Sequence, residues 1–312
     1  MFVGLDFNHD RIHVALGDHS SDVLGESVAD IDVDYSAAHA VDAAVEMVDA
    51  LRASAGVEKS RLVAAGVGLP GPIDDRTGAL ASAEILPGWA GLPAREMLSR
   101  RLGVPVQVEN DANLGALAEV TFGAARGLAD IIYIRVASGI GAGLVIGGRL
   151  FRGAAGMAGE IGHVQVRSDG VLCRCGNRGC LETVASERAI LAVLRPSHGE
   201  EVTRATIFEF LAAGDVGTSR VVSDGGRAIG RVLADICNVF NPEAAIIGGE
   251  LAEAGDPLLS GIRESIDRFA LPSVAQVAKV LPGELGERAE VLGALALAST
   301  PDQVITDRAL RV

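Results

Sequence analysis

Positive charge is scarce in this sequence of 312 residues. Its 27 Lys and Arg residues face 41 Asp and Glu residues, which gives a formal net charge of −14 at pH 7. Lysine occurs at Lys59 and Lys279 alone, so arginine carries nearly all of the positive charge. Because an acidic chain repels a polyphosphate backbone, we do not expect this one to bind nucleic acid by itself.

Long apolar runs are also missing. No run approaches the roughly 20 residues of a membrane-spanning helix, and the opening MFVGLDFNHD has neither a basic stretch nor a signal-peptide core. The 49% of hydrophobic and 22% of charged residues exclude a disordered or collagen-like chain. We therefore expect a cytoplasmic globular protein of about two domains that does not act at a membrane.

Cysteine is rare and unevenly placed. Cys173, Cys175 and Cys180 lie within eight residues, whereas Cys237 stands in an apolar segment and is expected to be a buried small hydrophobe. A disulfide scaffold would spread its cysteines through a small secreted chain, so the cluster favours a metal. With His163, ten residues before Cys173, the three thiols form a closed tetrahedral set for structural Zn²⁺. Three reduced thiols on a glycine-rich loop are the alternative.

The hydrophobic pattern predicts strand, glycine loop and strand twice, at 2–16 and at 131–151. Further strands are expected at 62–67, 104–108 and 244–247. Helices are expected at 37–51, 94–102, 114–120, 229–239 and 289–298. Two copies of strands followed by helices indicate two α/β lobes with a cleft between them.

Three polar residues, Glu109-Asn110-Asp111, end one of these strands. Ligands of open α/β sheets lie outside the carboxyl ends of the strands. An amide and a carboxylate there suit a polyol, because the carboxylate can accept a hydroxyl proton. The alternative is a helix N-cap, since Asn and Asp are preferred caps.

Two carboxylates, Glu160 and Glu182, bracket the proposed zinc loop. If zinc orders the loop, both side chains are held rigidly enough to bind hydroxyls. The alternative is a pair of solvated surface residues.

Two glycine segments could approach a ligand. Ser138-Gly139-Ile140-Gly141 could cradle phosphate or form a tight hairpin, and no dinucleotide fingerprint is present because a strand follows. Gly248-Gly249 could admit a ligand ring or simply turn the chain.

Trp89 is expected in the core or a cleft wall, and five histidines are expected at the surface: His9, His13, His19, His39 and His198.

Four motifs together resemble the ROK family of repressors, open reading frames and sugar kinases, over essentially the whole chain. They are GLPGPID (68–74), LPGW (86–89), ENDANLGALAE (109–119) and GEIGHVQVRSDGVLCRCGNRGCLE (159–182). The resemblance implies an actin-like (ribonuclease H-like) duplicated α/β fold, with two lobes and a hinge cleft. Residues 1–116 with about 290–312 would form the N-terminal lobe, and residues 117–289 the C-terminal lobe with zinc loop 163–182.

The resemblance also implies site residues. Zinc would be bound by His163, Cys173, Cys175 and Cys180, and a sugar by Gly71, Asn110, Asp111, Glu160, His163 and Glu182. In family kinases the Asp matching Asp111 is the general base, and the Asp matching Asp6 helps to place Mg²⁺. ATP would lie against Ser138, Gly139, Gly141, Gly248 and Gly249.

The first hairpin departs from that family. Its kinases carry Asp-x-Gly-Gly-Thr-Lys/Arg where this chain has Asp6-Phe7-Asn8-His9-Asp10-Arg11. The side chains of Asn8 and His9 would crowd the ATP phosphates, and Asp10 would repel them. At ~4 Å and an effective dielectric constant of about 20, one such pair of like charges costs ~4 kcal/mol, about a thousandfold in affinity. ATP and Mg²⁺ are therefore doubtful cofactors. In the second loop Ala137 replaces a family Gly, which is a milder change.

We therefore expect a sugar-binding ROK protein, the effector-sensing domain of a transcriptional regulator of carbohydrate metabolism with a degraded ATP site. The alternative is an ATP-dependent, glucokinase-like hexose kinase, and a third possibility is a zinc-stabilised scaffold without a ligand. No helix-turn-helix pattern precedes the first strand, so DNA contact is expected through a domain absent from this chain. The resemblance implies a homodimer or tetramer.

Overall fold

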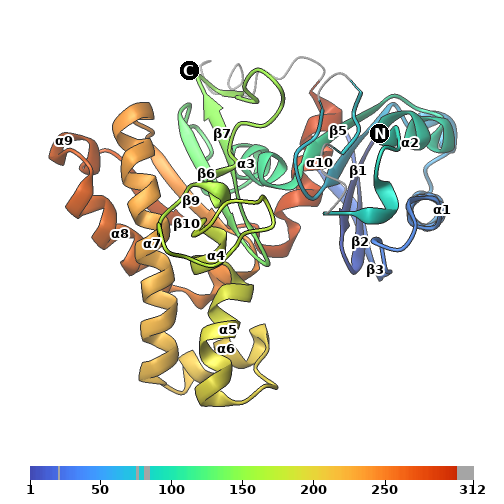
Figure 1. Cartoon of the computed structure of the whole chain (residues 1–312). Helices are drawn as coiled ribbons and strands as arrows, with labels where there is room; N and C mark the ends of the chain where they lie inside the picture. The colour runs from blue at the N-terminus through green and yellow to red at the C-terminus, as the bar shows by residue number, and fades with distance from the viewer. Residues whose placement is uncertain (20–21, 75–76, 81–84, 301–312) are drawn as a thin grey trace. The chain divides into compact units, whose positions relative to one another are not determined.

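The computed structural model describes residues 1–19, 22–74, 77–80 and 85–300 (Figure 1). The chain divides into two compact units. The first comprises Met1–Phe122, Gly148–Ala158 and the chain from Arg288 onwards; the second comprises Gly123–Gly147 and Gly159–Glu287. Residues 301–312, the end of the expected N-terminal lobe, lie outside the described residues. Among the described helices, none combines the length and the apolar character needed to cross a bilayer.

A mixed five-stranded sheet organises the first unit. Its order is β3-β2-β1-β4-β5, in which β1, β2 and β3 are antiparallel neighbours and β1, β4 and β5 run parallel. The strands are β1 (Phe2–Asn8), β2 (Arg11–Gly17), β3 (Val23–Asp30), β4 (Ala64–Leu69) and β5 (Val106–Asn110). Because side chains alternate along a strand, Val3, Leu5 and Phe7 enter one core together.

Helices cover both faces of this sheet. On the face where Val3, Leu5 and Phe7 are buried lie α1 (Ala37–Ser54) and α2 (Ala94–Leu102). The Ser36 hydroxyl caps α1, and Gly103, with φ +76°, is the C-cap of α2. On the other side α10 (Ala289–Ser299) packs directly on the strands, beside α3 (Asp111–Thr121). A Cβ at Gly66 would lie 1.9 Å from the carbonyl oxygen of Ala294. Glycine is therefore required for this close approach.

The second sheet repeats the strand order of the first. Four of its five strands, in the order β7-β6-β9-β10, correspond to β2-β1-β4-β5, again with one antiparallel hairpin followed by parallel strands. The strands are β6 (Ile131–Val136), β7 (Ile140–Ile146), β9 (Ala244–Gly248) and β10 (Lys279–Pro282). Strand β8 (Arg149–Leu150) lies in the part of the chain assigned to the first unit. The predicted α/β class and the duplication are confirmed.

Two helices, α7 (Val216–Phe240) and α8 (Asp256–Phe269), pack closely in the second unit (Figure 1). A Cβ at Gly226 would lie 2.3 Å from the Leu258 carbonyl oxygen, and one at Gly261 would lie 2.4 Å from that of Ser223. Glycines on both helices thus permit backbone contact. The unit also contains α4 (Glu182–Ala185), α5 (Glu187–His198), α6 (Arg204–Ala212) and α9 (Pro272–Ala275).

Several expected boundaries were wrong. Helix α7 begins at Val216 rather than Ile229, and Asp215 is its N-cap. The first half of this helix was missed because its glycines interrupt the apolar periodicity. Helix α3 begins at Asp111 rather than Leu114, and β4 spans Ala64–Leu69 rather than 62–67. His13, expected at the surface, is 8% exposed because β2 lies inside the sheet. Cys237 is buried as predicted.

Trp89 belongs to the core of the first unit, as one of its two expected positions. Its ring lies 5.1 Å from that of Phe7 in an edge contact. The indole Nε1–H donates to the carbonyl of Val33 at 3.2 Å, so the one polar atom of this side chain is satisfied.

Candidate functional site

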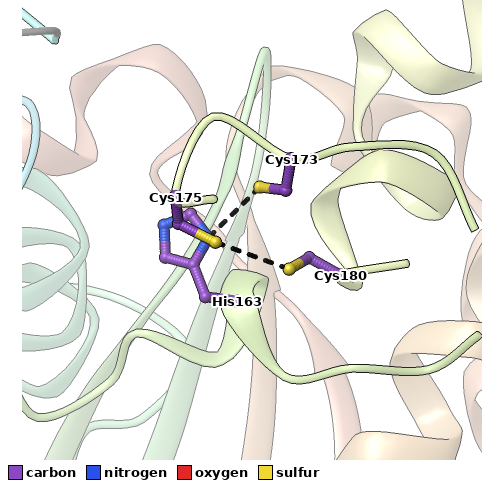
Figure 2. A group of neighbouring side chains, drawn as sticks. All are labelled: His163, Cys173, Cys175 and Cys180. Carbon is purple, nitrogen blue, oxygen red and sulfur yellow. Dashed lines mark hydrogen bonds between the residues drawn. The ribbon is translucent and has the colours of Figure 1, made fainter. Parts of the chain in front are cut away.

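Four predicted metal ligands converge in the second unit (Figure 2). One ligand atom each from His163, Cys173, Cys175 and Cys180 lies within 4.8 Å of the other three. Cys173 Sγ is 3.6 Å from His163 Nδ1, and Cys175 Sγ is 3.7 Å from Cys180 Sγ. Tetrahedral zinc, with Zn–S near 2.3 Å and Zn–N near 2.0–2.1 Å, requires separations of about 3.6 Å for N···S and about 3.8 Å for S···S. The donor set therefore fits zinc.

Close packing on β7 fixes the backbone that leads to His163. Gly159 has φ +99°, and a Cβ there would lie 1.9 Å from the Ala142 carbonyl oxygen. The N–H of Ala142 donates to the Gly159 carbonyl at 2.9 Å. A Cβ at Gly162 would lie 2.2 Å from the carbonyl oxygen of Ile140. The glycines of the GEIGH segment are thus needed for His163, in the 3₁₀ turn Ile161–His163, to take its place.

The two ring nitrogens of His163 face different groups. Nδ1 lies beside Cys173 Sγ, whereas Nε2 lies 3.8 Å from Oε2 of Glu160. A metal on Nδ1 leaves the proton on Nε2, which then serves as a hydrogen-bond donor. One residue can therefore be both a metal ligand and a donor to a second ligand.

Burial raises the pKa of the Cys173 thiol to about 12, and the carboxylate of Glu182 adds to this effect. Burial likewise raises the pKa of Cys180. The pKa of Cys175 is lowered, chiefly because the backbone N–H of Asn177 stabilises its thiolate. A metal ion at this site must therefore displace protons from two buried thiols, and its charge compensates the thiolates that result.

Glu182 is 2% exposed, so the solvated alternative is wrong for this residue. Its Oε1 accepts from Cys173 Sγ at 3.1 Å, and its Oε2 accepts from Arg174 Nη2 at 3.3 Å. Glu160, in contrast, has a side chain that is 37% exposed. The two carboxylates therefore differ in environment, although both contact the cluster or its ligand His163.

The glycine loop at Ser138 is the tight hairpin between β6 and β7. Val136 pairs with Ile140, and the N–H of Ala137 donates to the Gly139 carbonyl at 2.9 Å. A Cβ at Gly139 would lie 3.4 Å from both Arg174 Nη2 and Glu182 Oε2. The loop and the segment 163–182 are thus neighbours within one unit. Its role towards phosphate, like that of Gly141, stays a prediction.

Gly248 and Gly249 end β9 where it packs on β6. A Cβ at Gly248 would lie 2.3 Å from the Tyr133 hydroxyl, and one at Gly249, with φ +80°, would lie 2.6 Å from the Val136 carbonyl oxygen. Packing therefore suffices to explain this glycine pair, and its contact with a nucleotide stays a prediction.

In the first unit Asn110 is the N-cap of α3. Of the two roles expected for this residue, polyol binding and helix capping, the structure therefore shows the capping. Its Oδ1 accepts from the N–H groups of Ala112 at 2.9 Å and Asn113 at 3.2 Å. Its Nδ2 donates to the Gly71 carbonyl at 2.9 Å. Gly71 has φ +93°, and a Cβ there would lie 2.5 Å from Ile85 Cδ1. Asn110 thus joins the end of β5 to the loop after β4.

Glu109 is one of the three polar residues noted at the end of this strand, but no role was predicted for it. It is 4% exposed, yet its Oε1 accepts from the Asn110 N–H and from Asn113 Nδ2, each at 2.9 Å. Its Oε2 accepts from Arg152 Nε at 2.6 Å. The position directly before Asn110 was the one signal, and the partner, 43 residues away, could not be found from spacing.

Asp6 and Asp111 lie at the carboxyl ends of parallel strands of the same sheet. Asp6 pairs in register with Gly68 of β4, and a Cβ at Gly68 would lie 2.8 Å from Asp6 Oδ1. Asp111 begins α3, and its Oδ1 accepts from the Ala112 N–H at 2.8 Å. The fold therefore holds two carboxylates where the sheet ends.

The turn of the first hairpin forms hydrogen bonds within itself and to residues 31–34. The His9 N–H donates to Asn8 Oδ1 at 2.8 Å, and His9 Nδ1 lies 2.8 Å from Asp34 Oδ1. The carbonyls of His9 and Asp10 accept from the N–H groups of Val33 and Ile31, each at 3.0 Å. An incoming phosphate would have to displace the Asn8 side chain to reach the His9 N–H.

Comparison with known proteins places the chain in one family. The ROK family profile matches residues 2–301. The xylose repressor of Caldicellulosiruptor bescii is 31% identical over 308 residues, 95% of this chain and 77% of the repressor. A ROK glucokinase from Streptomyces griseus, solved with glucose and AMPPNP, is 32% identical with a TM-score of 0.82, covering 95% of this chain and 98% of the glucokinase.

A third similar structure is a ROK transcriptional regulator described as a homologue of the E. coli MLC protein. It is 27% identical with a TM-score of 0.84, over 100% of this chain and 81% of the regulator. These likenesses confirm the predicted actin-like fold class. This chain belongs to the ROK family.

Proposed function

We propose that the chain is a sugar-binding ROK protein that senses a carbohydrate effector for a transcriptional regulator and has lost the use of ATP. One observation carries this proposal. In the kinases that the sequence resembles, the first hairpin binds the ATP phosphates. Here the His9 N–H already donates to Asn8 Oδ1, and the His9 ring is hydrogen-bonded to Asp34. Similarity to the xylose repressor supports the regulatory role.

The proposal assigns sugar-binding groups to both units. In the first they are Asp111, Asn110 and Gly71; in the second they are Glu160, Nε2–H of His163 and Glu182. Carboxylates accept hydrogen bonds from sugar hydroxyls, while the imidazole N–H and the amide donate. Zinc on His163, Cys173, Cys175 and Cys180 would order the loop and so hold the side chains of Glu160 and Glu182 rigidly. Its role is structural, because four protein ligands leave no open position.

Signalling requires a further step. A sugar can change the regulator only if it binds one arrangement of the protein more tightly than another. We propose that a homodimer or tetramer in the cytoplasm passes this difference to a DNA-binding domain outside this chain. DNA contact by this chain itself is not part of the proposal, because its net charge is −14.

A second candidate, an ATP-dependent hexose kinase, is favoured by the two carboxylates at the sheet end. In that reaction Asp111 would accept the proton of the sugar hydroxyl that attacks the γ-phosphate, and Asp6 would help to place Mg²⁺. The similarity to a glucokinase solved with glucose and AMPPNP supports this candidate too. The two candidates share the sugar site and differ in the nucleotide.

Calorimetry separates them. Xylose, glucose and other common hexoses are titrated into the zinc-loaded chain, first alone and then with MgAMPPNP. The sensor proposal expects sugar binding and no heat from nucleotide, and a coupled assay should detect no phosphorylation with MgATP. Robust phosphorylation of any of these sugars would establish the kinase instead.

A further inference from the structure

The three thiols of the metal cluster differ in their access to solvent. Cys173 and Cys180 are buried, at 3% and 0% exposure, whereas Cys175 is exposed. The neighbouring Gly176 has φ +89°, and a Cβ there would meet nothing within 4 Å. An oxidant from solvent therefore reaches Cys175 first, on a part of the loop with room to move.

A partner thiol lies beside it. Sγ of Cys180 is 3.7 Å from Sγ of Cys175 (Figure 2), and a disulfide requires the sulfurs to approach to about 2.05 Å. Sγ of Cys173 instead has His163 Nδ1 at 3.6 Å and Glu182 Oε1 at 3.1 Å as its neighbours. The geometry thus favours Cys175 and Cys180 as the pair.

We propose that Cys175 is an oxidation site, at which hydrogen peroxide links Cys175 to Cys180 and so expels the metal. The Cys175 thiolate attacks the peroxide oxygen, the O–O bond breaks, and protonation of the leaving oxygen gives water and a sulfenic acid. Cys180 sulfur then attacks the sulfenic sulfur, and the S–O bond breaks to release a second water. Two thiolates, two protons and one peroxide give one disulfide and two waters.

Oxidation removes two of the four ligands together. His163 and Cys173 alone cannot complete a tetrahedral zinc site, so the metal dissociates. The segment between Glu160 and Glu182 then loses its central restraint. On the proposed sugar-sensing function, oxidation would lower sugar affinity at least tenfold, and a thiol reductant with zinc would restore it.

The arginines of the loop make the pairing directly measurable. Trypsin cleaves after Arg167, Arg174, Arg178 and Arg188, so the three thiols fall on separate peptides, 168–174, 175–178 and 179–188. The zinc-loaded chain is treated with hydrogen peroxide, free thiols are blocked, and the digest is examined by mass spectrometry. A chromogenic chelator follows zinc release in the same sample.

The expected product links peptide 175–178 to peptide 179–188, with one zinc released per link, and dithiothreitol with zinc reverses both changes. Cys237→Ala, which removes a buried thiol of α7, should give the same yield. Zinc retained without a link, or a disulfide through Cys173 or between two chains, would overturn the proposal. A reduced chain that takes up no zinc would also overturn it. Absence of sugar binding by the reduced, zinc-loaded chain would instead reject the sugar-sensing function alone.

Discussion

Arg152 Nε lies 2.6 Å from the buried Oε2 of Glu109, and this ion pair supports the polar end of β5. The other carboxylate oxygen of Glu109 accepts from the Asn110 N–H and Asn113 Nδ2. Asn110 in turn caps α3 and contacts the Gly71 carbonyl. The Arg152–Glu109 ion pair therefore helps to position Asn110, one of the residues that the sugar proposal uses in the first unit.

We expect Arg152→Met to destabilise the chain by about 3 kcal/mol, because it leaves a buried carboxylate without its cation. The side chains of Arg152 and Glu109 are 14% and 6% exposed, so water does not replace the lost partner well. Urea unfolding measures the loss. Arg149→Met, at an exposed arginine of the same segment, is the matched control and should change little. Equal stability of the two variants would contradict this account.

Restoring the family sequence in the first hairpin should restore nucleotide binding. The triple variant Asn8→Gly, His9→Gly, Asp10→Thr removes the Asn8 side chain from the His9 N–H and removes one negative charge. A like-charge penalty of ~4 kcal/mol corresponds to about a thousandfold in affinity, so calorimetry should detect MgAMPPNP binding in the variant. The single variant Asp10→Thr removes the negative charge but keeps the Asn8 side chain on the N–H of residue 9, so it measures the effect of the charge alone. Tight binding already in the unchanged chain would reject the sensor proposal.

Asp111→Asn should keep the fold and weaken sugar binding. The amide still offers an oxygen to the Ala112 N–H, so the start of α3 is preserved. The charge-assisted hydrogen bond to a sugar hydroxyl is lost, at a cost of about 1.5–3 kcal/mol. Sugar calorimetry measures the loss, and in the kinase candidate kcat should also fall by about 10²–10⁴. Asp267→Asn, on the exposed side of α8, is the control.

Removing a metal ligand should affect the loop and the sugar together. We expect Cys175→Ala to lose zinc, and protease cleavage within 163–182 to rise as the segment loses its restraint. Sugar affinity should fall although Cys175 is not proposed to contact sugar. Metal analysis, limited proteolysis and calorimetry check the three results. Cys237→Ala is the control and should retain zinc. If Cys175→Ala lost zinc but bound sugar with unchanged affinity, sugar binding would not depend on the metal.

Local signals predicted the elements that carry their own pattern. Helix α2 was predicted at its observed bounds, 94–102, and the strand, glycine loop and strand predicted at 131–151 contain β6, the hairpin loop and β7. The thiol cluster was predicted from the spacing of Cys173, Cys175 and Cys180 with His163, and the ligand atoms do converge. These features depend on residues near one another in sequence.

Features that depend on distant partners could not be predicted. Glu109 gains its role from Arg152, and Glu182 is buried because Arg174 and Cys173 cover its carboxylate. A Glu in isolation is usually exposed, so the sequence left a solvated surface residue open as the alternative for Glu182. His13 was expected at the surface because the sequence showed no partner for it, although tertiary packing buries it against Glu26.

His13 should make stability depend on pH. Burial is the main cause that lowers its pKa; Arg11 and Arg288 add to this, while Glu26, 3.0 Å from Nε2, opposes it. The unfolded chain therefore binds a proton at a higher pH than the folded one, so stability falls as pH drops below about 6.5. Glu26 acts in the same direction at lower pH. Burial raises its pKa, but Arg288 and His13 outweigh this and hold it below its usual range.

His13→Gln should flatten the fall of Tm between pH 7.5 and 5.5, since glutamine can donate to Glu26 without titrating. Acid also protonates the zinc ligands, but it does so equally in both proteins. The difference between the two Tm profiles therefore isolates His13. His39→Gln, at an exposed residue of α1, should reproduce the unchanged profile. A slope shared by His13→Gln and the original chain would mean that the buried imidazole takes up its proton as readily in the fold as in the unfolded chain.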